Sequence, residues 1–131
     1  MVNIRRLKLT LMAFVEDPVT DVGFHCINNL HKLEYLFLET TEDEDDFFNR
    51  YHVFLNFSSW VQQVSASEIH LKGFRKFYLH NLLDFMLNPN LRTLTLEQCG
   101  KGSRMIEGVR KLKQLIGDLR PLPHIAFINA W

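Results

Sequence analysis

The sequence predicts an α/β fold in which about five parallel strands alternate with helices and stack into a curved solenoid. Two observations lead to this prediction. A short pattern of apolar residues recurs five times along the chain, and the segments between the copies carry apolar residues at helical spacing. Strands separated by helices imply a parallel sheet, because each helix returns the chain to the end of the sheet at which the previous strand began.

The composition fits one domain spanning residues 1–131. With 47% hydrophobic and 23% charged residues, the chain has enough apolar material for a core. Its 15 basic and 15 acidic residues cancel, so we expect no nucleic-acid partner. No apolar run reaches the roughly 20 residues of a membrane helix, and we expect no membrane partner either. Two cysteines and no visible signal peptide indicate a cytoplasmic or nuclear protein.

The repeated pattern places apolar residues at the first, fourth and sixth positions of each copy. The clearest copy is Leu91-x-x-Leu94-x-Leu96, and the other four begin at Ile4, Leu33, Ala66 and Leu122. The fourth positions of the five copies are Leu7, Leu36, Ile69, Leu94 and Ile125, and subtracting their numbers gives steps of 29, 33, 25 and 31 residues. Because side chains alternate along a strand, the fourth and sixth residues point inward and their neighbours point outward.

The middle copy has a competitor. Phe74-x-x-Phe77-x-Leu79 also fits the strand pattern, but it would make the repeat steps very unequal. The apolar residues from Phe74 to Phe85 instead recur mostly at helical spacing. We therefore predict a helix over about 74–87, which ends at Asn88-Pro89 because a residue before proline resists the α conformation.

Three further helices complete the alternation. Thr20 or Asp21 can cap a helix that carries Val22, Ile27 and Leu30. A second amphipathic segment runs from Phe47 to Val64. Ser103 can cap the last helix, which we expect to end before Pro121 and Pro123. The final strand is predicted over His124 to Trp131.

Two stretches resemble a known family. Val19-Thr20-Asp21-Val22-Gly23-Phe24 resembles the "ITDxGL" helix start of the cysteine-containing leucine-rich repeats of F-box proteins. Asn88-Pro89-Asn90-Leu91-Arg92-Thr93-Leu94-Thr95-Leu96-Glu97-Gln98-Cys99 is similar to their "CPxLxxLxLxxC" strand, with Asn88 in place of the first cysteine. The resemblance implies a leucine-rich-repeat solenoid that recognises substrates for a cullin-type ubiquitin ligase, with a Skp-type adaptor and a cullin as further partners.

The chain departs from that family because it shows no F-box segment, which would dock on the adaptor. This leaves two interpretations open. The chain is a fragment of a longer protein, or it is a stand-alone repeat protein resembling the mitochondrial ATP-synthase coupling factor B family. The second interpretation implies a structural or assembly component in mitochondria. The predicted last strand has no capping element after it, which favours a fragment or a strand covered by a partner.

The candidate partner-binding residues lie on the outward side of the predicted strands, the usual binding surface of a solenoid. Tyr35 and Phe37 are the most informative, because aromatic residues on an exposed face are typical hot spots for a protein partner. In the alternative interpretation these rings pack against their neighbours across the strands. The predicted partner-binding residues are Arg6, Lys8, Tyr35, Phe37, Glu39, His70, Lys72, Thr93, Thr95 and Glu97.

No motif indicates an enzyme, a metal site or a cofactor. The cysteines and histidines lack the spacing of a metal site or of a nucleophile with its base, and Gly100-Lys101-Gly102-Ser103 lacks the spacing of a phosphate loop. An acidic run over residues 40–46 follows the second predicted strand. We interpret it as a solvated loop that starts the next helix, although it could also bind a basic partner or a cation, or accept a phosphate.

Overall fold

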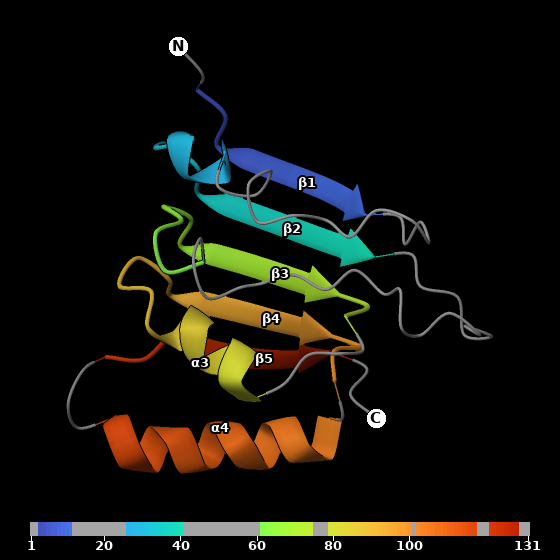
Figure 1. The fold of residues 1–131 in the computed structure, drawn as a ribbon, viewed down its shortest axis with the longest axis vertical. Coiled ribbons are helices and arrows are strands. Elements are labelled where there is room, and N and C mark those ends of the chain that lie inside the picture. The colour runs from blue at the N-terminus through green and yellow to red at the C-terminus, as the bar shows by residue number, and fades with distance from the viewer. Residues whose placement is uncertain are drawn as a thin grey trace.

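Five strands form one parallel sheet, and their order in the sheet is their order in the chain (Figure 1). The strands are β1 (Arg6–Leu11), β2 (Tyr35–Thr40), β3 (Glu68–Lys72), β4 (Thr93–Glu97) and β5 (His124–Ile128). The helical elements are the 3-10 helix η1 (Cys26–Asn29) and the α-helices α3 (Leu79–Met86) and α4 (Gly102–Ile116). The structure, a computed structural model, describes residues 3–11, 26–40, 61–74, 79–100, 102–117 and 121–128.

The strand register confirms the alignment of the five sequence copies. Leu7, Leu36, Ile69, Leu94 and Ile125 are direct neighbours across the sheet. The third strand of the sheet is Glu68–Lys72 rather than the competing copy, whose last residue, Leu79, lies in α3. The predicted α/β fold with parallel strands is therefore confirmed.

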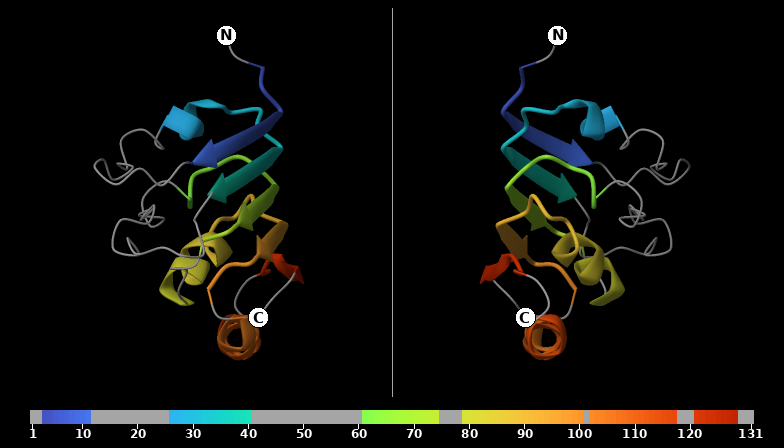
Figure 2. Two further views of the ribbon diagram at one scale, coloured as in Figure 1. Left: turned by 90° about the vertical axis from the view of Figure 1, so that its right-hand side faces the viewer. Right: turned by 90° about the vertical axis from the view of Figure 1, so that its left-hand side faces the viewer.

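The inward face of the sheet forms the core. The side chains of Leu36, Leu38, Leu71 and Leu94 are completely buried. Burying one such side chain stabilises the fold by about 1.5–3 kcal/mol. Figure 2 shows η1 and α3 on one side of the sheet, while no described helix covers the opposite side. The inward face and the helical layer thus enclose one core, and the outward face is left bare by the described elements.

The two α-helices differ from their predicted bounds. The part of α3 that is described begins at Leu79, and Phe74 is a buried residue outside the helix whose carbonyl oxygen accepts a hydrogen bond from Gly100 N (3.1 Å). The predicted start of this helix at Phe74 is therefore wrong. α4 begins at Gly102, so Ser103 lies in its first turn and does not cap it. The last residue of the helix is Ile116, before Pro121 and Pro123 as expected, and Gly117 N–H bonds the Lys113 carbonyl oxygen at 2.9 Å.

The other two predicted helices are described only in part. The proposed caps Thr20 and Asp21 lie outside the described residues, whereas Ile27 is buried in η1. Of the segment from Phe47 to Val64, only the last four residues are described; residues 61–63 form a turn rather than a helix. Residues 129–131 of the predicted last strand and residues 41–46 of the acidic run also lie outside the described part of the chain.

The turns that lead into the strands are joined from one repeat to the next by side-chain hydrogen bonds. Ser65 Oγ, before β3, donates to the carbonyl oxygens of Leu30 (2.9 Å) and Leu33 (3.0 Å), before β2. Asn88 Nδ2, before β4, donates to those of Val61 (2.7 Å) and Val64 (3.0 Å), before β3. These bonds satisfy carbonyl groups that the strand ladder does not reach and hold successive turns in line.

The turns that follow β3 and β4 share a backbone feature. Gly73 and Gln98 each lie four residues after the aligned residues Ile69 and Leu94, and both have positive φ angles of 83° and 54°. A left-handed residue at this point turns the chain away from the sheet, and glycine adopts that conformation more readily than glutamine. The same turn therefore recurs with two different residue types.

Candidate functional site

The outward face of the sheet carries all of the predicted partner-binding residues. The strand register arranges its side chains in three rows that cross the sheet. From the start of the strands to their end, the rows are Arg6, Tyr35, Glu68, Thr93 and His124; Lys8, Phe37, His70, Thr95 and Ala126; and Thr10, Glu39, Lys72, Glu97 and Ile128. We call these residues the outward face. Their predicted orientation is confirmed by the burial of the apolar residues that alternate with them.

The two aromatic residues of β2 are each flanked by a cation from β1. The Arg6 guanidinium lies 4.3 Å from the centre of the Tyr35 ring, and Lys8 Nζ lies 5.0 Å from that of Phe37. On its other side, Phe37 is tilted at 48° against the His70 ring, with ring centres 4.4 Å apart. Both aromatic side chains remain partly exposed. They therefore pack against their cross-strand neighbours and also keep part of their ring surface exposed to solvent.

The phenol of Tyr35 is affected by this environment. Partial burial raises its pKa above the ordinary value of 10.0, the nearby Arg6 charge lowers it, and Glu68 raises it. The net effect is upward, so Tyr35 is a neutral hydroxyl group at physiological pH. It offers a hydrogen-bond donor beside a flat apolar ring, a combination that is common at protein interfaces.

A charged network joins the last row of the outward face. Glu97 accepts from His70 through Oε1 (3.1 Å) and approaches Lys72 Nζ through Oε2 (3.6 Å). Lys72 Nζ also lies 3.4 Å from Glu39 Oε2, and Thr10 Oγ1 donates to Glu39 Oε1 at 3.4 Å. The network spans β1 to β4 and connects through His70 to the Phe37 ring. Its members therefore restrict one another's side-chain conformations.

The outward face differs in shape and residue type between β1 and β2 on one side and β4 on the other. A shallow hollow of about 280 Å³ lies over β1 and β2, lined by Arg6, Leu7, Lys8, Tyr35 and Phe37. Over β4 the corresponding residues are Thr93 and Thr95, which are partly buried and uncharged. The aromatic and cationic half of the outward face is therefore the part best suited to anchor a partner.

A second concavity was not predicted from the sequence. It is an open cleft of about 800 Å³ at the edge where the strands begin, and we call it the strand-start cleft. Its lining residues are Arg5, Arg6, His31, Lys32, Leu33, Glu34, Tyr35, Ser65, Ser67, Glu68, Pro89, Asn90 and Arg92. Arg5, Glu34, Ser67 and Arg92 occupy the same repeat position, directly before their strands. That shared position is a signal by which these four residues could have been found.

The described residues provide no sign of metal or thiol chemistry. No group of three or more His, Cys, Asp and Glu side chains among them is arranged to hold a metal ion. Cys99 Sγ lies 3.4 Å from the carbonyl oxygens of Leu71 and Glu97, and burial raises the pKa of its thiol to about 12. Cys99 is therefore a neutral packing residue. Of the helices in the described ranges, none is long and apolar enough to cross a membrane.

Comparisons with known proteins found no matching family model, curated protein or solved structure. A function for this chain is therefore inferred from the outward face itself. Two of its properties are informative: an aromatic and cationic anchor region over β1 and β2, and a network of interactions that fixes the side chains around that region.

Proposed function

We propose that this chain is a protein-interaction module of the leucine-rich-repeat type, which binds a protein partner through the outward face. The observation that carries the proposal is the pair Tyr35 and Phe37, displayed on a sheet face that no described helix covers and flanked by Arg6 and Lys8. Aromatic and arginine side chains supply most hot spots of protein interfaces. A bare face with such residues suits recognition of a protein surface.

Recurring structural details support the repeat assignment. Aligned residues of the five sequence copies are neighbours in the sheet. Ser65 and Asn88 make comparable bonds from one turn to the preceding one, and Gly73 and Gln98 form the same left-handed turn after their strands. In a solenoid each repeat contacts mainly its neighbours, so bonds of this kind are expected at every junction.

The order already present in the outward face favours binding. His70 and Glu97 have side chains that are each only 17% exposed and bonded to each other. Side chains that are already ordered lose little conformational entropy when a partner covers them. The binding energy of Tyr35 and Phe37 is therefore not offset by a large ordering cost.

Substrate recognition for an F-box-type ubiquitin ligase is the specific role that we propose for this module. Affinity capture with the chain as bait, followed by mass spectrometry, tests that role. Capture of a Skp-type adaptor and a cullin together with a further protein is the expected result. Capture of one stable partner at a fixed ratio, without adaptor or cullin, would instead indicate that the chain is a structural or assembly component.

The binding face is tested by a double substitution, Tyr35→Ala with Phe37→Ala. We expect the captured partner to bind at least about 30-fold more weakly, because a single interface hot spot contributes about 2 kcal/mol or more. The melting temperature should fall by less than about 5 °C, since both rings are partly exposed. Leu115→Ala, which alters a residue 73% exposed on α4, is the matched control and should retain binding. If the double variant lost much of its stability while its folded fraction bound the partner as before, the two rings would serve in packing only.

A further inference from the structure

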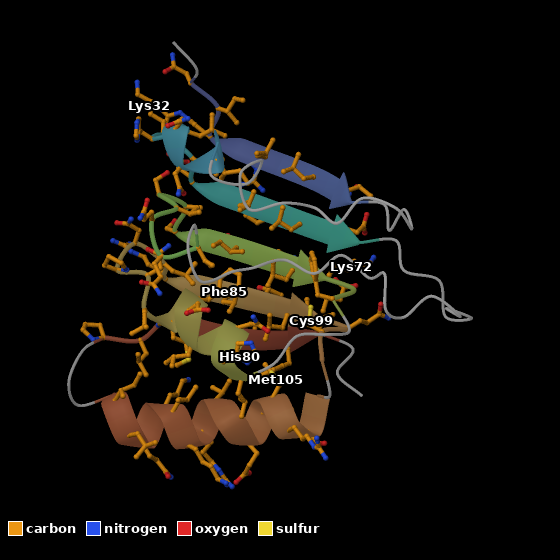
Figure 3. The ribbon with its side chains drawn as sticks, in the orientation of Figure 1. Lys32, Lys72, His80, Phe85, Cys99 and Met105 are labelled. Carbon is orange, nitrogen blue, oxygen red and sulfur yellow. The ribbon has the colours of Figure 1, made fainter. Side chains whose placement is uncertain are left out.

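The strand-start cleft lies beside the outward face but is distinct from it in chemistry. It opens at the edge where the strands begin, and Arg6, Tyr35 and Glu68 belong to both surfaces. Figure 3 shows Lys32 at this end of the sheet and Lys72 at the opposite end, near the tip of β3. A partner that covers Tyr35 can therefore continue directly into the cleft.

The lining of the cleft is positively charged, although the chain as a whole is neutral. Four cationic side chains face two carboxylates, which leaves an excess of two positive charges before His31 is considered. Arg5 is paired with Glu34 at 2.7 Å, and Arg6 lies over the Tyr35 ring. Among the described residues, no carboxylate lies within ion-pair distance of Lys32 or Arg92. These two cations carry the unbalanced charge.

Apart from the Tyr35 hydroxyl, the serine and asparagine donors of the cleft already have partners. Ser67 Oγ donates to the Glu34 carbonyl oxygen (3.4 Å), and Ser65 Oγ donates to those of Leu30 and Leu33. Asn90 Nδ2 donates to Val64 O at 3.3 Å. A ligand that needs neutral hydroxyl or amide donors would have to displace these bonds. An anion needs only the charges of Lys32 and Arg92, so the cleft favours an anionic ligand.

The cations Lys32 and Arg92 line one edge of the sheet, along which an extended peptide can lie. Lys32 is in the turn before β2 and Arg92 directly precedes β4, so the turn before β3 separates them. An extended chain directs every second side chain to the same side, at intervals of roughly 7 Å, so an acidic segment presents a row of carboxylates to this edge. A nucleic acid is a poorer match, because its bases need aromatic rings on which to stack, and Tyr35 and His31 are the only such rings among the described lining residues.

We propose that the strand-start cleft binds an acidic segment, rich in Asp and Glu, of the protein partner whose surface covers the outward face. This proposal rests on the proposed function and specifies the chemistry of the partner. Lys32 and Arg92 are the residues that bind its carboxylates. Arg5 and Glu34 form the rim of the cleft, where their exposed pair contributes little binding energy of its own.

The test uses a fluorescein-labelled hexaglutamate peptide and measures its fluorescence anisotropy with the chain. We expect binding that weakens as salt is added, and no binding of a hexaglutamine peptide of equal length. The double variant Lys32→Glu with Arg92→Glu should bind hexaglutamate at least about tenfold more weakly. Lys111→Glu with Lys113→Glu, which makes the same charge change at exposed positions of α4, should bind as the original chain does.

Several results would overturn the proposal. Equal binding of hexaglutamine, or equal loss in the α4 control variant, would show that the cleft does not recognise carboxylates. Tighter binding of a six-nucleotide oligouridylate than of hexaglutamate would assign the cleft to nucleic acid. Self-association in analytical ultracentrifugation that is lost when residues 42–46 are neutralised would assign it to a second copy of this chain. Partner capture that depends on Tyr35 and Phe37 tests the outward face separately, so failure of the cleft would leave that result unaffected.

Discussion

The two faces of the sheet are formed by the same five strands, but different interactions join the strands on each face. On the inward face, Leu36, Leu38 and Leu94 are completely removed from solvent. On the outward face, neighbouring strands are joined by ring contacts and by charged pairs that remain partly exposed, such as Lys72 with Glu39. Burial contributes far more free energy than partly exposed ion pairs do. The comparison indicates that stability depends mainly on the inward face, which leaves the outward face available for the recognition that we propose.

Among the substitutions that test this difference between the two faces, Leu94→Ala on the inward face should have the largest effect on stability. Truncating a completely buried leucine leaves a cavity, and we expect the free energy of unfolding to fall by about 2–5 kcal/mol. Urea denaturation followed by circular dichroism measures the change. Partner capture, corrected for the folded fraction, should stay the same. A loss of binding by fully folded molecules would show that the inward face shapes the binding surface directly.

Asn88→Ala tests the junction between repeats and should have the second-largest effect. Asn88 is a buried side chain that donates to the carbonyl oxygens of Val61 and Val64 and accepts a hydrogen bond from Asn90 N at 2.8 Å. Its removal takes the side-chain partner from the Val61 carbonyl oxygen and from Asn90 N, and leaves the Val64 carbonyl oxygen only its longer bond to Asn90 Nδ2, so we expect a loss of about 1–3 kcal/mol in the free energy of unfolding. Thermal unfolding measures the loss.

Asn90→Ala is the matched control for Asn88, because Asn90 is exposed and makes a longer bond of 3.3 Å to the same Val64 carbonyl oxygen. Its effect should be clearly smaller. Equal effects of the two substitutions would mean that the junction between the turns is held mainly by the backbone.

The sequence was sufficient to predict the strands and the two faces, because the period of two along each strand is a local pattern. Leu94 and Leu96 were assigned inward, and Thr93 and Thr95 outward, from alternation alone, and the register of β3, β4 and β5 agrees. Gly73 and Gln98 form the same left-handed turn, although their residue types differ and do not by themselves predict it. The backbone conformation there follows from the position in the repeat rather than from the residue.

The helix bounds and the junctions could not be read in the same way. Phe74 has helical spacing relative to later residues, but it is buried outside the helix, close to Gly100. Asn88 was interpreted as the end of a helix and as a replacement for a cysteine, although its side chain also bonds the preceding turn. The strand-start cleft was not predicted, because Lys32 lies outside the shared position that Arg92 occupies before its strand, and the two residues come from different sequence copies. Each of these features depends on contacts between repeats, which a local pattern does not contain.

Glu97→Gln on the outward face should have the smallest effect of the three substitutions. It removes the charge that Glu97 shares with His70 and Lys72 but keeps a side chain of nearly equal shape. Because both partners are partly exposed, we expect the free energy of unfolding to fall by less than about 1 kcal/mol. Chemical denaturation at low and high salt measures the change, and the difference from the original chain should shrink as salt is added.

Arg110→Gln provides the control for Glu97→Gln, because Arg110 pairs with Glu107 at 2.6 Å on the exposed side of α4, away from the sheet. We expect no measurable change in stability from it. If Glu97→Gln costs more than about 2 kcal/mol while Arg110→Gln costs nothing, the outward network would contribute to folding as a buried group does. In that case the outward face would stabilise the fold as well as bind the partner, and substitutions at Tyr35 and Phe37 would have to be interpreted together with their effect on stability.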